Sequence, residues 1–451
     1  MSITFVQKSD LTVRKKNAKI ALVLAGGAVS GGAYKLGGLK ALSDLMINRD
    51  VTDFDIFVGL SAGAILAVPI SMGITPEELL KSVDGQSDRL VQLKPLDFYN
   101  PNIMEFIQKP LQFVFDTSTS LPRFGINFLS MLFSTDRKFF SSVKELIVHP
   151  NYHNFDNVVK ILVKMALASQ SFPKFFSYLP SGIFDNAKLE TYIRTNLERN
   201  HQKNDFSDIF HRHRKELYIT ATKLDSGERV VFGHDEDNDL TVSEAVQAST
   251  ALPGFYKPAR IKGIDYVDGA IASTANIDVA IDHGASLVIC YNPFRPLYNK
   301  LLVQWYKDID QYVTDKPHLA QGGLLAVLNQ VFRMLLHHRL HQAVQVYQQD
   351  PSFVGDIILI EPDVNDVQFF EINPINFWDR AKAAERGFLS AKESLDTHYP
   401  LIKKILGSYG IETSMIHIEE DAKKIESKPY DEAILGVLAK ERIKRDIRLV
   451  M

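Results

Sequence analysis

The stretch Asp55-Ile56-Phe57-Val58-Gly59-Leu60-Ser61-Ala62-Gly63-Ala64-Ile65-Leu66 decides how the rest of the sequence is interpreted. It opens with a short run of β-branched and aromatic residues that ends at a glycine, which is typical of a buried strand. The pattern Gly-x-Ser-x-Gly follows, and a second apolar run rich in Ala and Leu then predicts a helix. This order predicts a sharp strand-to-helix turn with Ser61 at its tip.

A serine held on such a turn is the arrangement known as a nucleophile elbow. Gly59 and Gly63 carry no Cβ that would crowd the turn, and the Ser61 hydroxyl is expected at a helix N-terminus. Backbone N–H groups and the positive end of the helix dipole would then lie where negative charge develops on an acyl oxygen. The pentapeptide alone is a weak signal, because a chain of this length contains it by chance about one time in ten. A tight turn with a buried serine is the competing interpretation.

Composition limits the classes of function. The chain has 451 residues, 45% of them hydrophobic, and a net charge of -3, so no overall positive field favours nucleic acid. Its single cysteine, Cys290, lies in an apolar run and can form no intrachain disulfide, which fits a reducing, cytoplasmic location. The first 19 residues contain no apolar segment of a secretory signal peptide. Residues 56–74 are uncharged, but their glycines and Pro69 favour a buried strand and helix over a transmembrane span.

The pattern along the chain predicts a layered α/β fold. Residues 19–24 (KIALVL) are apolar throughout, which is typical of a strand buried on both faces of a parallel sheet. A glycine-rich turn over 25–32 and a helical pattern over 33–45 precede the serine elbow. This βαβα order predicts a three-layer α/β/α architecture with a mainly parallel central sheet. Further strands are expected over these stretches: 216–222, 229–232, a hairpin over 260–267, 286–291 and 356–360.

Five segments are expected. They are a polar N-terminal arm (1–18), a main α/β domain (19–395), a helical, aromatic-rich cap within it (about 75–185), a largely helical insertion (about 299–348) and a helical C-terminal extension (396–451). The cap either packs simply on the core or forms a lid or acyl-chain pocket. The final helix, 434–450, carries five cationic residues, which either face solvent or contact anionic lipid.

The glycine-rich turn Ala25-Gly26-Gly27-Ala28-Val29-Ser30-Gly31-Gly32 has three interpretations. A dinucleotide fingerprint would need G-x-G-x-x-G in register, and a Walker loop would need a final Gly-Lys-Ser/Thr; neither is present. The third interpretation is an oxyanion hole, formed by consecutive amides at a helix N-terminus. A strand, turn and helix just before the serine elbow suit this role best.

Asp268 is the strongest candidate for the base that activates Ser61. It closes a predicted strand, and Gly269 allows a sharp turn that would leave the carboxylate at the end of the sheet. Burial beside the serine would raise its pKa and improve it as a base, although a simple turn-forming Asp-Gly is the alternative. Of thirteen histidines, His337 and His341 are four apart on a predicted helix and could ligate a metal, but a core or surface pair is favoured. No metal or cofactor is predicted.

These features together resemble the patatin-like phospholipases, which are serine lipid acyl hydrolases with a Ser-Asp dyad. The resemblance extends from about Lys19 to Leu395. It depends on these motifs: the turn over 26–32, the helix after it, Gly59-x-Ser61-x-Gly63, the stretch 245–255 and Asp268-Gly269-Ala270. It implies that Ser61 is the nucleophile, Asp268 the general base, and the amides around Gly26, Gly27 and Ala28 the oxyanion hole. The implied activity is hydrolysis of fatty-acyl esters of membrane lipids, in lipid degradation.

One feature departs from the family pattern. The family loop usually reads Gly-Gly-Gly-x-Arg/Lys-Gly, whereas this chain has Gly26-Gly27-Ala28-Val29-Ser30-Gly31, without a basic residue. Ala28 is expected to cost little if its φ is negative. The missing cation leaves a second hypothesis open, a catalytically weak scaffold that binds lipid or a protein partner. Peripheral membrane contact and a homo-oligomer are further open expectations.

Overall fold

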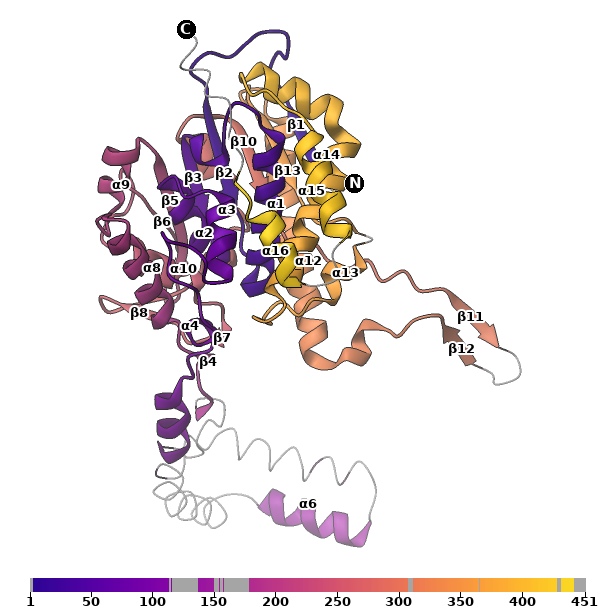
Figure 1. Cartoon of the computed structure of the whole chain (residues 1–451). Helices are drawn as coiled ribbons and strands as arrows, with labels where there is room; N and C mark the ends of the chain where they lie inside the picture. The colour runs from indigo at the N-terminus through magenta and orange to yellow at the C-terminus, as the bar shows by residue number, and fades with distance from the viewer. Residues whose placement is uncertain are drawn as a thin grey trace. The chain divides into compact units, whose positions relative to one another are not determined.

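The structure, a computed structural model, describes residues 3–112, 115, 137–149, 154, 157, 178–306, 311–364, 366–427 and 431–441. The chain divides into two units, residues 1–100 with 184–451 and residues 101–183. The second unit contains α6 (Arg137–Val148), and the first contains the central sheet and the residues of the candidate site (Figure 1).

A nine-stranded sheet lies at the centre of the first unit, in the order β1-β13-β10-β2-β3-β5-β9-β8, with β6 also paired to β5 (Figure 1). Its strands are β1 (Ile3–Gln7), β2 (Lys19–Leu24), β3 (Ile56–Gly59), β5 (Glu216–Lys223), β6 (Arg229–Phe232), β8 (Ala259–Ile261), β9 (Ile264–Asp268), β10 (Ala285–Tyr291) and β13 (Asp356–Ile360). The five strands from β13 to β5 are parallel to one another, and the strands that flank them are antiparallel. The predicted mainly parallel sheet is confirmed in these five central strands.

Helices cover both faces of this sheet. Side chains alternate along β2, so that Ile20, Leu22 and Leu24 join one core cluster while Ala21 and Val23 join another. The first cluster also contains residues of α1 (Ala28–Leu45), α2 (Ala62–Ser71) and α14 (Arg380–Ser408). The second contains residues of α11 (Ile277–Asp282) and α12 (Gly323–Gln349). The three-layer α/β/α architecture is therefore confirmed.

The remaining elements connect or extend these layers. The helices are α3 (Pro76–Val83), α4 (Pro95–Phe98), α8 (Ala187–Arg199), α9 (Phe206–His213), α10 (Val242–Thr250), α13 (Val367–Glu371), α15 (Ile416–Glu426) and α16 (Asp431–Leu438), with 3-10 turns at Val51–Asp53, Gly269–Ile271 and Leu319–Gly322. The short strands are β4 (Gly182–Phe184), β7 (Gly254–Tyr256), β11 (Val303–Tyr306) and β12 (Gln311–Thr314). Among the described helices, none combines the length and the apolar character that crossing a bilayer requires.

Two segments differ from the expectations. The predicted polar N-terminal arm contains β1, which pairs with β13 at the edge of the sheet and buries Ile3 and Val6. Phe5 packs against the core as well, although it is only partly buried. This five-residue strand is too short for its apolar residues to stand out from the polar arm that follows it. The predicted helical insertion begins instead with the hairpin of β11 and β12, and helix α12 starts only at Gly323.

The expectations for the cap and the tail are only partly covered by the described residues. Phe124, Phe128 and Phe133 of the aromatic-rich segment lie outside them, so the cap stays a prediction. Helices α14, α15 and α16 confirm the helical character of the tail as far as Leu438. The cationic residues from Arg442 onward lie outside the described residues, and lipid contact by the tail stays a prediction as well.

Candidate active site

Ser61 occupies the strained turn that its sequence predicts. It lies directly before α2 with φ 53 and ψ -126, a combination that costs a non-glycine residue of order 1–3 kcal/mol. The neighbouring glycines allow this conformation because the backbone approaches closely on both sides. A Cβ added to Gly63 would lie 2.0 Å from the carbonyl oxygen of Leu24, and one added to Gly59 would lie 2.6 Å from the Cα of Ala64. Strand β3, the turn and α2 thus hold the hydroxyl at the carboxyl end of the sheet.

The register of the sheet brings Asp268 level with Ser61. Gly59 of β3 pairs with Ile219 of β5, and two residues further along β5, Ala221 pairs with Asp268 of the antiparallel strand β9. The two candidate residues therefore flank β5 at the same height, although 207 positions separate them in the sequence. The Ser61 hydroxyl lies within hydrogen-bonding reach of the Asp268 carboxylate. The structure thus brings the predicted pair together.

Burial dominates the electrostatics of Asp268. Its side chain is 1% exposed, and this desolvation raises the pKa of the carboxyl group to about 6. Three groups act in the opposite direction and lower the pKa, namely the Ser61 hydroxyl, the N–H of Ala270 at 2.9 Å from Oδ1, and the charge of Lys35. A carboxylate with a raised pKa is a better proton acceptor than an exposed one, so this carboxylate has the basicity that proton transfer from a serine requires.

Helix α10 and the residues after it fix the backbone on both sides of the pair. The N–H of Ser61 donates to Oγ of the buried Ser249 at 2.8 Å, and the N–H of Asp268 donates to the carbonyl of Ala251 at 2.9 Å. Both acceptors belong to the stretch 245–255 that carries part of the family resemblance. Its role in the structure is to tie the serine turn and the aspartate strand to one element.

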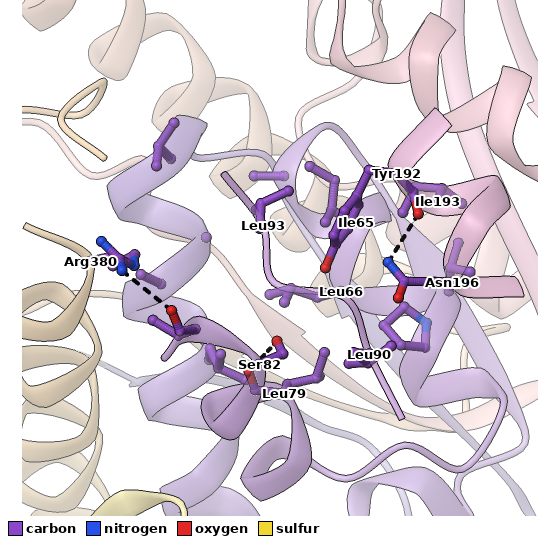
Figure 2. A pocket seen from close by; sticks show the side chains of 18 of the residues that line it. Ile65, Leu66, Leu79, Ser82, Leu90, Leu93, Tyr192, Ile193, Asn196 and Arg380 are labelled. Carbon is purple, nitrogen blue, oxygen red and sulfur yellow. Dashed lines mark hydrogen bonds between the residues drawn. The ribbon is translucent and has the colours of Figure 1, made fainter. Parts of the chain in front are cut away.

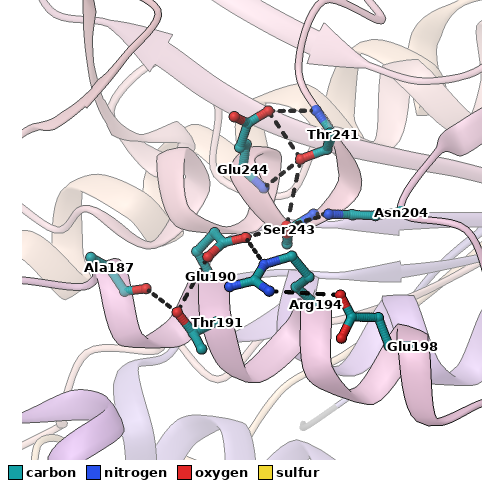
Figure 3. A network of polar contacts seen from close by, with 9 residues as sticks. All are labelled: Ala187, Glu190, Thr191, Arg194, Glu198, Asn204, Thr241, Ser243 and Glu244. Carbon is teal, nitrogen blue, oxygen red and sulfur yellow. Dashed lines mark hydrogen bonds and ion pairs between the residues drawn. The ribbon is translucent and has the colours of Figure 1, made fainter.

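The start of α10 is itself anchored to α8 by the polar network of Figure 3. Thr241 and Glu244 form a capping box at the N-terminus of α10. Ser243 donates to Oε1 of Glu190 at 2.8 Å, and Glu190 in turn pairs with Arg194 of the same helix α8. Because the network fixes the beginning of α10, it also fixes the position of Ser249 near the other end of that helix.

The glycine-rich turn lies close to Ser61 at Gly26. A Cβ added to Gly26 would lie 3.3 Å from the Cβ of Ser61 and 2.8 Å from Cε2 of Phe294, so a side chain there would require a shift. Within the described part of the chain, the N–H groups of Gly26, Gly27 and Ala28 donate to no backbone carbonyl. The same holds for the N–H of Ala62, directly after the serine, a position that often contributes to oxyanion holes and that the sequence analysis did not single out.

The expectation of a negative φ at Ala28 is wrong. Its φ is +53, in the left-handed region, and not negative as a low cost would require. The conformation costs an alanine on the order of 1 kcal/mol. The reason lies in the turn itself, since Gly27 at φ 155 leads directly into the first residue of α1. The replacement of a family glycine by Ala28 is therefore strained but accommodated.

Lys35 supplies a cation beneath the turn, and the sequence analysis missed it. It lies two turns into α1, its side chain is fully buried, and its ammonium group donates to the carbonyls of Ala25 and Gly26, the latter at 3.0 Å. Helical side chains lean toward the N-terminus, which lets Lys35 reach back to the turn. Burial lowers the pKa of Lys35 to about 7, while the nearby Asp268 and Cys290 raise it. A basic side chain, absent from the loop itself, thus reaches the turn from the helix that follows.

An apolar pocket opens beside the turn and the serine (Figure 2). It is bordered by Ala28 on the turn and by Ala62, the residue after Ser61. Its walls are largely apolar, and Figure 2 shows Ile65, Leu66, Leu79, Leu90, Leu93 and Ile193 among the lining side chains. Asn196 and Arg380 are directed into local hydrogen bonds with the carbonyls of Tyr192 and Val83. The pocket suits a hydrocarbon chain better than a polar ligand.

Comparisons with known proteins now identify the family. The model of the patatin-like phospholipase family matches residues 22–281, which include Ser61, Asp268, Lys35 and the glycine-rich turn. The chain belongs to the patatin-like phospholipase family. A probable lipid hydrolase of Invertebrate iridescent virus 6 is 21% identical over 293 residues, covering 63% of this chain and 74% of the viral protein. Family and relative support a lipid hydrolase that acts on lipid esters.

Solved structures give more distant matches. VipD from Legionella pneumophila is 14% identical with a TM-score of 0.30, over 94% of this chain and 91% of that one. ExoU in its complex with SpcU from Pseudomonas aeruginosa is 15% identical with a TM-score of 0.27, over 97% and 67%. Because both scores are low, the assignment to the patatin-like phospholipases depends on the family model.

Proposed function

We propose that this patatin-like phospholipase hydrolyses fatty-acyl esters of lipids through a covalent acyl-enzyme on Ser61, with Asp268 as the general base. The observation that carries the proposal is the strained Ser61 with its hydroxyl within hydrogen-bonding reach of a buried carboxylate whose pKa is raised to about 6. A nucleophile and a base in this relation are the minimum that serine hydrolysis requires.

In the first half of the reaction, Ser61 Oγ attacks the ester carbonyl carbon while its proton passes to Asp268. The electron pair of the carbonyl bond moves to the oxygen, which becomes an oxyanion. When this intermediate collapses, the ester C–O bond breaks and the leaving alcohol takes the proton from Asp268. In the second half, Asp268 takes a proton from water as the water oxygen attacks the acyl carbonyl carbon, and a second tetrahedral intermediate forms. When it collapses, the bond from the acyl carbon to Ser61 Oγ breaks, Asp268 returns the proton to Oγ, and the fatty acid is released.

The N–H groups at Gly26, Gly27 and Ala28 and that of Ala62 support the stabilisation of the oxyanion, because they have no backbone acceptor among the described residues. Gly26 approaches Ser61 closely, and Ala62 directly follows it. A donor of this kind is worth on the order of 3–4 kcal/mol in comparable sites. The apolar pocket beside Ala28 and Ala62 would take the acyl chain. Because lipids with long hydrocarbon chains gather in membranes and aggregates, the substrate would be presented to the site there.

A fluorophosphonate probe tests the proposal, because it phosphonylates only an activated serine. We expect labelling of the full-length chain that disappears in Ser61→Ala, and faster turnover of micellar than of dispersed esters. The matched control is Ser71→Ala, which removes another buried serine of α2 that hydrogen-bonds only to its own helix. A folded chain that is not labelled would instead favour the weak scaffold that binds lipid or a protein partner.

A further inference from the structure

Three metal-binding side chains meet at the carboxyl end of β13, away from the serine turn. His337 and His341 lie one turn apart on α12, and Glu361 directly follows β13. His337 Nδ1 lies 3.1 Å from Oε1 of Glu361, and His341 Nε2 lies 2.8 Å from Oε2. One ligand atom from each residue lies within 4.8 Å of the others. The sequence shows the two histidines, but only the fold adds the carboxylate.

These distances are close to what a tetrahedral metal ion requires. With metal–ligand bonds of about 2.0–2.2 Å, neighbouring ligand atoms in a tetrahedral zinc site lie about 3.3 Å apart. The 3.1 Å distance from His337 Nδ1 to Oε1 is near this value, and the 2.8 Å distance from His341 Nε2 is to the other carboxylate oxygen, so a small adjustment brings the three ligands onto one ion. Two imidazoles on successive helical turns and one carboxylate are also a donor set that zinc sites use. We propose that His337, His341 and Glu361 bind a divalent transition-metal ion, for which Zn²⁺ fits best.

A hydrogen bond from a buried neighbour fixes the orientation of the Glu361 carboxylate. Glu361 is 4% exposed, and Nδ2 of the fully buried Asn292 donates to its Oε1 at 2.8 Å. Such outer contacts orient the ligands of metal sites. The side chain of His341 is 31% exposed, which gives an ion a route from solvent and leaves a fourth position for water. The arrangement therefore combines a fixed anionic ligand with an accessible side.

The same contacts connect the metal site to the serine turn. Asn292, which donates to Glu361, also accepts the N–H of Phe294 at 3.1 Å through its Oδ1. The ring of Phe294 packs against Gly26, where an added Cβ would lie 2.8 Å from Cε2. On α12, Arg339 donates to the carbonyls of Ala270 and Ile271, just after Asp268. A bound ion would thus stiffen α12 and the loop over the turn, a structural role that is independent of the proposed hydrolysis.

The test is a titration of the full-length, chelator-treated protein with Zn²⁺, and separately with Co²⁺. We expect one equivalent of Zn²⁺, and for Co²⁺ the visible absorption bands of a four-coordinate ion. His341→Ala and Glu361→Gln should each weaken binding at least about 100-fold, since even outer-contact losses cost 10–100-fold. His338→Ala is the matched control, because it removes an exposed histidine of the same helix that lies outside the trio and should bind as the unaltered chain does.

Two results would overturn the site. One is the absence of a stoichiometric Zn²⁺ equivalent in the unaltered chain, which would leave an imidazole–carboxylate hydrogen-bond cluster. The other is unchanged binding in folded His341→Ala, the variant that removes the most exposed ligand of the three. Ser61→Ala should bind Zn²⁺ normally, so a failure of the metal site and a failure of the hydrolase proposal remain distinguishable.

Discussion

Asp268 and Glu361 are both buried carboxylates at the same edge of the sheet, yet their environments shift their pKa values in opposite directions. Burial raises the pKa of Asp268 to about 6, although the Ser61 hydroxyl, the Ala270 N–H and Lys35 lower it. Burial would also raise the pKa of Glu361, but hydrogen bonds and charge from His337 and His341 hold it well below its usual range. The kind of partner, and not burial alone, therefore separates the two carboxylates, since two imidazoles contact both oxygens of Glu361. Asp268 keeps the basicity that the proposed proton transfer needs, and Glu361 favours the anionic form.

The largest expected effect tests the role of Asp268 directly. Asp268→Asn keeps the shape of the side chain but removes the proton acceptor, and Ser61→Ala removes the nucleophile. We expect each to lower kcat for ester hydrolysis about 10⁴-fold, as losses of base or nucleophile do in serine hydrolases. Steady-state kinetics on a micellar ester measure this, with Ser71→Ala as the control. Activity of Asp268→Asn within tenfold of the unaltered chain would remove Asp268 from the mechanism.

Lys35 gives the next largest effect, because it positions the turn beside the base. Lys35→Met leaves the carbonyls of Ala25 and Gly26 without their donor. We expect kcat to fall about 10²-fold with KM nearly unchanged, comparable to the loss of one oxyanion contact. Lys19→Met is the control, since Lys19 forms a half-exposed ion pair with Glu216 at the far end of β2. A change in KM alone would show that Lys35 acts on substrate binding and not on the turn.

The pH dependence of kcat/KM tests whether burial sets the pKa of Asp268. Because Asp268 must be ionised and its pKa is about 6, the rate should fall about tenfold per pH unit below pH 6 and level off above it. The charge of Lys35 lowers that pKa, so Lys35→Met should move the inflection to higher pH. A pH series with a soluble ester measures both. An inflection near pH 4 in the unaltered chain would show that burial does not tune this carboxyl group.

The sequence predicts the pair of Ser61 and Asp268 much better than the cluster around Glu361. Ser61 and Asp268 stand in local patterns, a glycine-flanked turn and a strand-ending Asp-Gly, that predict their conformation without knowledge of the fold. The continuous apolar strands likewise predict the parallel core, since a strand such as 19–24 can only be buried on both faces.

What the sequence did not predict depends on contacts between distant elements. Lys35 looks like an ordinary helical lysine, and it is buried because its side of α1 faces the sheet, where it reaches the carbonyls of Ala25 and Gly26. On the same side of α1, a Cβ on Gly38 would lie 2.0 Å from the hydroxyl oxygen of Tyr291 in β10. Glu361 likewise meets His337 only because α12 packs against the sheet over a cluster that includes residues of β13. A local sequence pattern does not predict contacts of this kind between distant elements.

The smallest effect concerns folding stability and has the opposite sign to the effect on activity. The pKa of Asp268 is raised from 3.8 to about 6 in the folded chain, so the folded state holds a proton that the unfolded state releases between these values. Stability is therefore lost as pH rises from about 4 to about 6, by up to about 3 kcal/mol at 1.36 kcal/mol per unit.

Asp268→Asn removes this loss but weakens the contact with Ser61. We expect the variant to be about 1–2 kcal/mol more stable than the unaltered chain at pH 7, with the gain absent at pH 4. Urea unfolding at both pH values measures it, and a variant that is less stable at pH 7 than at pH 4, relative to the unaltered chain, would mean that Asp268 is stabilised as an anion in the way Glu361 is.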